Sequence, residues 1–137
     1  MKRNFVIGTV LATVIIFTVL GISLYPVFGQ ESFTIARMVV AEGVEDREPV
    51  GVSETFPAST ERVYCFLEAT NIADDTEVTF VWYLEEEEVH TFNLPLKHGP
   101  RWRTFAYKNL REQTGNWRVE LKDSDGNTVE SVTFTVE

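Results

Sequence analysis

The chain has 137 residues, with 12 Lys and Arg against 21 Asp and Glu, and its formal net charge is −9. A surface this acidic repels phosphate backbones, and no basic stripe interrupts it, so nucleic acid is not expected as a partner. Once the first 30 residues are set aside, about 107 remain, which is enough for one compact domain but not for two.

The first feature along the chain is an uncharged N-terminal stretch, residues 4–30. Within it, residues 5–25 form an apolar run that would span about 31 Å as a helix, which matches a hydrocarbon core of about 30 Å. Lys2 and Arg3 directly precede this run, and positive flanks stay on the cytoplasmic side. We therefore predict one N-terminal transmembrane helix, with a domain over residues 31–137 outside the cytoplasm.

A cleavable signal peptide is the alternative interpretation of residues 1–30. Such a signal has an apolar region of about 7–15 residues and small residues at the cleavage site. The run here is longer, which favours an uncleaved anchor, but Pro26 would break the helix and Gly29 offers a tolerable cleavage site before Gln30. Both interpretations place the domain outside the cytoplasm, as a single-pass membrane protein in one case and as a secreted protein in the other.

Cys65 is the only cysteine in the sequence. No intrachain disulfide can form, although an exported domain would permit one. The residue follows Tyr64 in an apolar run, which indicates a buried thiol rather than a nucleophile or a metal ligand. The domain must therefore be stabilised by its hydrophobic core alone.

Short runs of β-branched and aromatic residues, separated by turn signals, fill the chain from residue 33 onward. They predict seven strands, with no amphipathic helix after the N-terminal segment, at residues 33–41, 62–69, 77–84, 89–96, 101–107, 116–122 and 128–136. Residues 43–57 hold two prolines, two glycines and four acids, and are expected to form a loop or an irregular edge. Residues 108–114 are expected to form a polar crossover or a single helical turn.

This spacing predicts an all-β fold, a single antiparallel β-sandwich with immunoglobulin-like topology, and a partly open barrel is the alternative. The clearest alternation lies in residues 77–84, where Val78, Phe80 and Trp82 point to one side and Tyr83 to the other. Large apolar side chains on the inward-facing positions make up the predicted core, which contains Cys65, Phe66, Trp82, Trp117, Val119, Leu121 and Phe134.

No motif in the sequence indicates catalysis, a metal site or a bound cofactor. His90 and His98 are the only histidines and lack a third ligand at metal spacing. The four acids at residues 85–88 would alternate faces in a hairpin, so they indicate a solvated loop tip rather than a cation site. Residues 123–127 (DSDGN) predict a hairpin turn, because Gly accepts the positive φ that the turn requires. We therefore expect a protein that is not an enzyme.

The remaining candidates for a functional role are aromatic and arginine residues. Trp102 lies between Arg101 and Arg103 just after a turn, and Tyr83 lies on the second side of an alternating strand. Such side chains form stacking platforms for sugars or anchor residues for partner proteins. These four residues are therefore the candidate interaction surface, although tryptophans in alternating strands also fill hydrophobic cores.

A set of short motifs occurs along the chain in one order. The motifs are Arg47-Glu48-Pro49, Val63-Tyr64-Cys65-Phe66, Val81-Trp82-Tyr83, Gly99-Pro100-Arg101-Trp102-Arg103-Thr104, Gly115-Asn116-Trp117-Arg118-Val119, Asp125-Gly126 and Phe134-Thr135-Val136. This set resembles the bacterial family called domain of unknown function 2914, over about residues 33–137. The resemblance implies an extracytoplasmic β-domain attached to a membrane segment, and no activity. One departure is Phe80, where the family tends to carry His.

These observations predict a membrane-tethered, extracytoplasmic and non-catalytic interaction module that binds a protein or glycan of the cell envelope. The alternative is a structural subunit of a membrane complex or surface filament, because an apolar N-terminal helix followed by a β-sandwich also builds such subunits. The membrane itself is an expected partner through the N-terminal helix. The sequence indicates no particular oligomeric state.

Overall fold

Residues 32–137 are the part of the chain that the computed structural model describes, and they consist of strands joined by turns and short loops. The strands are β1 (Thr34–Glu45), β2 (Glu48–Val52), β3 (Thr55–Phe56), β4 (Arg62–Ile72), β5 (Thr76–Leu84), β6 (Glu87–Leu96), β7 (Gly99–Asn109), β8 (Gly115–Lys122) and β9 (Thr128–Val136). Within these residues no helix has the length and apolar character needed to cross a bilayer. The helix predicted at residues 5–25, and with it the choice between anchor and signal peptide, lies outside the described residues.

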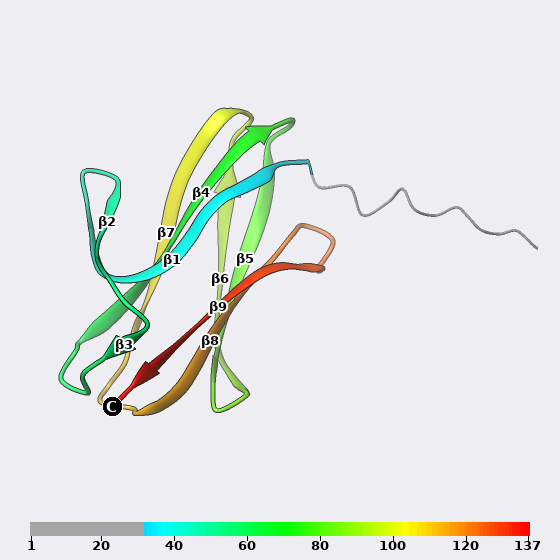
Figure 1. The fold of residues 1–137 in the computed structure, drawn as a ribbon. Helices are drawn as coiled ribbons and strands as arrows, with labels where there is room; N and C mark the ends of the chain where they lie inside the picture. Colours follow the sequence, from blue (N-terminus) through cyan, green and yellow to red (C-terminus); the bar gives the residue numbers. More distant parts are fainter. Residues whose placement is uncertain (1–31) are drawn as a thin grey trace, which may run out of the picture. The chain divides into compact units, whose positions relative to one another are not determined.

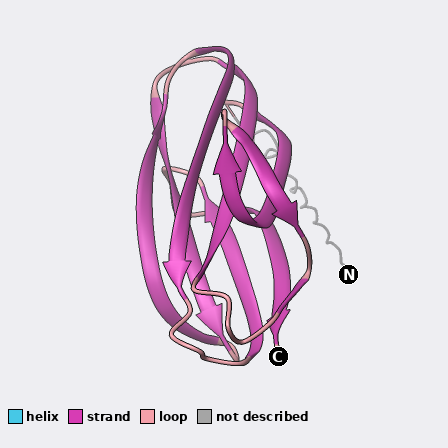
Figure 2. Cartoon of the chain, turned by 90° about the vertical axis from the view of Figure 1, so that its left-hand side faces the viewer, coloured by secondary structure: helices cyan, strands magenta, loops and turns pink. Residues whose placement is uncertain are grey.

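The strands form two sheets that pack face to face (Figure 1). One sheet has four strands in the order β2-β1-β4-β7, and the other has five in the order β3-β9-β8-β5-β6. Most of the turns gather at the two ends of the long strands (Figure 2). The all-β sandwich predicted from the spacing of strands and turns is confirmed.

One pair of strands departs from the predicted antiparallel arrangement. β3 runs parallel to β9, with Thr55 opposite Thr135. The amide of Glu137 continues this pairing by donating to the carbonyl of Phe56 at 3.0 Å. The prediction of a wholly antiparallel sandwich is therefore wrong at this edge, because β3 is too short to be recognised without its partner.

Residues 43–57 were expected to lack regular strands, and this expectation is wrong. They contain the end of β1 together with β2 and β3, so the described part of the chain has nine strands rather than seven. β1 reverses into β2 at Asp46 and Arg47, which both have positive φ (53° and 64°). Pro49 is tolerated in β2 because β2 is an edge strand, where a missing N–H need not remove a ladder hydrogen bond.

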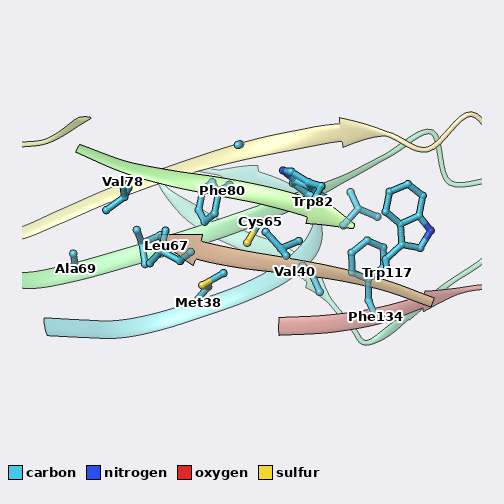
Figure 3. Packing of buried hydrophobic residues seen from close by; sticks show 14 of the residues in the cluster. Met38, Val40, Cys65, Leu67, Ala69, Val78, Phe80, Trp82, Trp117 and Phe134 are labelled. Carbon is cyan, nitrogen blue, oxygen red and sulfur yellow. The ribbon is translucent and has the colours of Figure 1, made fainter. Parts of the chain in front are cut away.

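The core lies between the two sheets and is built mainly from alternate residues of β1, β4, β5, β8 and β9 (Figure 3). Phe80 and Trp82 of β5 point inward and are fully buried, as their alternation predicts. Cys65 of β4 is fully buried too, and this burial raises the pKa of its thiol. Other predicted core residues confirmed between the sheets are Trp117, Val119, Leu121 and Phe134.

Phe134 of β9 lies at the centre of an aromatic cluster. Its ring stacks on that of Trp117, with centroids 5.7 Å apart and planes at 10°. Phe56 and Trp82 meet the same ring edge-on, at centroid separations of 5.7 and 6.4 Å. These are the offset and edge-to-face geometries that aromatic quadrupoles favour. One side chain therefore joins β3, β5, β8 and β9.

Phe66 is buried as predicted, but it does not lie between the sheets. Its side chain is 1% exposed and points to the opposite side of β4 from Cys65 and Leu67, outside the main core cluster. The Cζ atom of Arg37 lies 5.0 Å from the centroid of its ring. The prediction of Phe66 as an inter-sheet residue is therefore wrong, and an arginine helps to cover it in place of the second sheet.

Two of the predicted loops are shorter than expected. In residues 108–114, the first two belong to β7, Leu110 is fully buried and no helical turn forms. In residues 85–88, Glu85 and Glu86 make the turn with φ of 50° and 69°, and Glu87 already begins β6. Strand pairing on both sides of each turn extends the strands further than local composition indicates.

The turn predicted at residues 123–127 is confirmed as the connection of the β8–β9 hairpin. The Oδ1 atom of Asp123 accepts hydrogen bonds from the amides of Asp125 and Asn127, at 3.0 and 2.9 Å. Gly126 has a φ of 87°, which is the left-handed conformation that the Asp-Gly signal predicts.

Removal of the Phe134 ring should strongly destabilise the domain. We expect Phe134→Ala to lower the free energy of unfolding by about 3–5 kcal/mol, because it leaves a cavity among three aromatic rings. The matched control is Phe92→Ala, since Phe92 is 39% exposed and its loss should change stability by about 1 kcal/mol or less. Urea unfolding followed by tryptophan fluorescence measures both, and equal losses would contradict the central role of Phe134.

Candidate functional site

The face of the four-stranded sheet that points away from the core, here called the outer face, concentrates charged and aromatic side chains. It is formed by the residues of β1, β4 and β7 that alternate with the core positions. Strand register places Glu68 opposite both Arg103 of β7 and Arg37 of β1, and Phe66 opposite Phe105. The outer face therefore brings an ionic cluster next to aromatic rings.

Three arginines share two carboxylates in this ionic cluster. Arg37 Nη2 lies 3.1 Å from Oε1 of both Glu48 and Glu68. Arg103 Nη2 lies 3.2 Å from Glu48 Oε2, and Arg101 Nη1 lies 3.5 Å from Glu68 Oε2. The hydrogen bond to Glu48, more than that to Glu68, raises the pKa of the Arg37 guanidinium. The cluster has one more positive than negative charge, in a chain whose net charge is −9.

Arg103 is the most enclosed arginine of the cluster. Its side chain is 22% exposed, against 37% for Arg37 and 56% for Arg101. Its Nη1 donates to the backbone carbonyl of Arg47 at 3.4 Å. Its buried Nε has no hydrogen-bond partner, and the closest carboxylate oxygen, from Glu68, is 3.9 Å away. Arg103 thus packs against the β1–β2 turn, and its Nε–H group is not hydrogen-bonded.

Aromatic rings continue the outer face beyond the ionic cluster. Tyr64 lies between Phe105 and Tyr107, at centroid distances of 5.7 and 5.4 Å. The Cζ atom of Arg62 lies 4.4 Å from the centroid of Tyr107, within cation–π distance. Phe105 and Tyr107 remain 40% and 39% exposed. The outer face therefore presents two large rings to solvent beside the arginines.

A depression of about 490 Å³ lies where the ionic cluster meets the aromatic rings. We call it the arginine pocket. Its lining combines three arginines with aromatic and small side chains, and consists of Val44, Arg47, Phe66, Arg101, Trp102, Arg103, Thr104 and Phe105. Guanidinium groups bind carboxylates through paired hydrogen bonds, and exposed rings stack on planar or apolar surfaces. The arrangement is suited to binding an acidic group attached to an apolar or sugar-like body.

The structure separates the four residues predicted as an interaction surface. Arg101 and Arg103 lie together on the outer face and line the arginine pocket. Trp102 alternates with them and packs partly against the core, with a buried Nε1 that has no hydrogen-bond partner. Tyr83 belongs to the other sheet, where the Cζ atom of Arg118 lies 4.2 Å from its ring centroid. Three of the four residues, Arg101, Trp102 and Arg103, therefore line the candidate site, and Tyr83 does not.

Several residues of the site were not found from the sequence. Arg37, Arg47, Glu48 and Glu68 lie on β1, β4 and the β1–β2 turn region, far from Arg101 in the chain. One local signal was available in β4, where polar and aromatic residues alternate with the buried ones. The remaining residues meet only through the pairing of β1 with β2 and of β4 with both β1 and β7.

The two histidines lie apart from each other, one within β6 and one beyond its end. His90 pairs in register with Trp82, and its ring meets Phe92 edge-on at 6.1 Å. His98 follows the end of β6, and its amide and Nδ1 both lie within hydrogen-bond distance of Asp75 Oδ1, at 2.8 and 3.1 Å. The hydrogen bond from the His98 amide is the largest cause that lowers the pKa of Asp75. Among residues 32–137, no group of three or more His, Cys, Asp or Glu side chains is placed to hold a metal ion.

A second depression of about 720 Å³ lies at the other end of β7. Loops supply most of its lining, and two arginines there, Arg62 and Arg111, are accompanied by the acids Glu61 and Glu112. Because its charges are balanced and it lacks aromatic rings, it offers less specific chemistry than the arginine pocket.

The family model described as "Protein of unknown function (DUF2914)" matches residues 75–136. This part of the chain belongs to the DUF2914 family. The match confirms the resemblance over β5 to β9, but it does not extend over the whole of residues 33–137. Within the arginine pocket, Arg101 and Arg103 fall inside the matched segment, whereas Arg47 and Phe66 fall outside it.

Solved structures with a similar arrangement of strands include two β-glucosidases. The enzyme from Kluyveromyces marxianus shares 12% identity with a TM-score of 0.46, over 77% of this chain and 14% of that one. The enzyme from Listeria innocua shares 9% identity with a TM-score of 0.48, over 76% of this chain and 15% of that one. The chain thus spans only a small fraction of either enzyme, and at these TM-scores no activity is transferred to it. No curated protein sequence matches the chain.

Neutralising Glu68 should weaken the domain, because its carboxylate lies near three arginines and is 13% exposed. We expect Glu68→Gln to lower the free energy of unfolding by about 1–2 kcal/mol, since the guanidinium groups would lose a shared counter-charge. Glu48→Gln removes the same charge from a residue that is 47% exposed and should cost less than about 1 kcal/mol. Urea unfolding of the two variants side by side measures the difference, and an equal or smaller effect of Glu68→Gln would contradict this ranking.

Proposed function

We propose that this protein is a non-catalytic binding module, tethered to the membrane and presented outside the cytoplasm, whose arginine pocket binds a carboxylate group of an envelope protein or glycan. The observation that supports the proposal best is the concentration of arginines and aromatic rings in that pocket. It forms a local excess of positive charge on a chain whose net charge is −9. Such an excess attracts and orients acidic ligands.

Two of the pocket arginines have the greatest freedom to bind a ligand. Arg101 is 56% exposed and has one ion pair, at 3.5 Å. Arg47 makes no ion pair within the described residues, and its backbone carbonyl accepts a bond from Arg103. Arg37 and Arg103 are occupied by Glu48 and Glu68 and so position the pocket. A carboxylate between Arg47 and Arg101 would gain charge-assisted hydrogen bonds without breaking the ionic cluster.

The composition of the arginine pocket favours binding over catalysis. Its lining contains arginines, aromatic rings, Val44 and Thr104, and it holds no His, Cys, Lys, Asp or Glu side chain. The two carboxylates beside it, Glu48 and Glu68, already accept hydrogen bonds from Arg37. General acid–base chemistry needs a group that can exchange a proton at the working pH.

The order of strands supports an immunoglobulin-like topology for the domain. β1, β4 and β7 lie together in one sheet, and β9, β8, β5 and β6 lie in the other. β3 crosses from the first part of the chain to the second sheet and pairs with β9. Domains of this architecture commonly serve as binding modules at cell surfaces, which is an analogy of fold and not of site.

Acidic ligands should bind at the arginine pocket, and their affinity should fall as the salt concentration rises. The probes are tetragalacturonate, a tetraglutamate peptide and the neutral maltotetraose, added to the full-length protein and followed by calorimetry. We expect at least one acidic probe to bind, and Arg101→Ala to weaken it about tenfold through the loss of a charge-assisted bond. The matched control is Arg111→Ala, an exposed arginine at the second depression, which should leave the affinity unchanged.

The outcome of this experiment separates the sources of the carboxylate. Binding of tetragalacturonate alone indicates a glycan, and binding of the peptide alone indicates a protein. Equal binding of maltotetraose, or equal effects of Arg101→Ala and Arg111→Ala, would contradict a role for charge in the arginine pocket.

The location of the domain can be tested with a cysteine in the β8–β9 turn. Ser124 is exposed there, and Ser124→Cys leaves the Asp123 hydrogen bonds of the turn in place. We expect a membrane-impermeant thiol reagent to label this variant in intact cells whose outer wall admits it. The unchanged protein is the control, because its only thiol, Cys65, is buried. Labelling only after the membrane is broken would place the domain in the cytoplasm.

The same samples report whether the N-terminal segment is retained. A gel mass near 15.6 kDa indicates an uncleaved anchor. A product smaller by about 3 kDa indicates removal of a signal peptide.

A further inference from the structure

β7 forms a long free edge at one end of the four-stranded sheet (Figure 1). It is hydrogen-bonded to β4 on one side only, and this pairing runs from Gly99 to Asn109 without a shift of register. In an antiparallel edge strand, every second residue directs its N–H and C=O outward, where another strand can pair with them.

The other edge strands carry features that hinder pairing. β6 contains Pro95 and a register shift beside Trp82, and it begins with the acids Glu87 and Glu88. β2 and β3 have only five and two residues. β7 has Pro100 as its second residue, and a regular strand follows. Among the described strands, β7 is therefore the long edge with the least protection against pairing.

The outer side of β7 is complementary to itself. Its side chains run in the order Arg101, Arg103, Phe105 and Tyr107. If two copies pair antiparallel about Thr104, each Arg101 lies opposite Tyr107 of the second copy, and each Arg103 opposite Phe105. Arginine–aromatic contacts are favourable, and the domain already contains one on Tyr107 and one on Phe66.

Shifted registers lose part of this complementarity. Pairing centred on Arg103 would place Arg103 opposite itself, which is unfavourable for like charges. Pairing centred on Phe105 would leave Arg101 opposite Asn109 instead of an aromatic ring. In the register centred on Thr104, repulsion between the two copies of Arg103 is reduced because Glu48 and Glu68 already balance that charge.

We propose that two copies of this chain associate through β7, antiparallel and centred on Thr104, so that the two four-stranded sheets become one continuous sheet. Because a two-fold axis relates the two copies, the β7 edge of each copy is paired with the β7 edge of the other, and no third copy can add to it. Both arginine pockets would then lie on the same face of the joined sheet, on either side of the axis. A ligand with two carboxylates could bind both pockets and gain from their proximity.

Cysteine cross-linking tests the arrangement directly. In the full-length protein, Thr104→Cys places the introduced thiol of one copy opposite the same thiol of the second copy. Their Cβ atoms would be about 4.5–5.5 Å apart, and a small adjustment brings them into disulfide range. Arg103→Cys and Phe105→Cys report the two shifted registers in the same way. We expect a mild oxidant to give a disulfide dimer mainly from Thr104→Cys, and none from the unchanged protein, because Cys65 is buried.

Two substitutions of opposite charge at one site test the complementarity. Phe105→Lys faces Arg103 of the second copy and should raise the dimer dissociation constant about tenfold or more, whereas Phe105→Glu faces the same arginine and should leave it within about threefold. Both remove the same ring, so the contacts of the ring itself are lost equally in the two variants. Sedimentation equilibrium of the full-length protein in detergent measures both constants.

Three results would overturn the proposal. The first is a protein that remains monomeric at all concentrations. The second is equal weakening by Phe105→Lys and Phe105→Glu, which would indicate a purely apolar contact. The third is a dimer that neither substitution changes and that Thr104→Cys does not cross-link, which would place the contact elsewhere.

Discussion

The packing of Phe134 against the rings of Trp117, Trp82 and Phe56 is the interaction on which the rest of the domain depends. The only cysteine is buried and unpaired, so no covalent link joins the two sheets. The aromatic cluster brings together β3, β5, β8 and β9, and in doing so fixes the five-stranded sheet. A cavity among such large rings would strongly lower the free energy of unfolding, so this packing makes the fold specific as well as stable.

The outer face follows a different physical principle. Phe66 is as well buried as a core residue, yet an arginine covers it in place of a second sheet. The guanidinium group of Arg37 that covers the ring is paired with Glu48 and Glu68. Because arginines outnumber these carboxylates, the same arrangement that covers the ring also leaves a surplus of positive charge. The proposed binding of an acidic ligand uses that surplus.

β7 connects the two proposals made for this protein. Its outer residues line the arginine pocket, and its free edge is the surface proposed for self-association. A residue such as Arg103 contributes to both. Its guanidinium nitrogens contact Glu48 and the β1–β2 turn, while its position along β7 sets the register with a second copy. Arg101 and Phe105 likewise line the arginine pocket and face the second copy in the proposed pairing, so substitutions there should affect both ligand binding and association.

The sequence by itself determined the all-β class, the inward face of β5, the buried state of Cys65 and the turn at residues 123–127. These features depend on period-two alternation and on local turn chemistry, which a single segment contains in full. The tertiary structure alone decided the short strands β2 and β3, the outward orientation of Phe66, and the meeting of Arg37, Glu48, Glu68 and Arg103. Each of these depends on strands far apart in the chain lying next to each other. Alternation shows that a strand has two faces, but only the packing of the second sheet shows which face is covered.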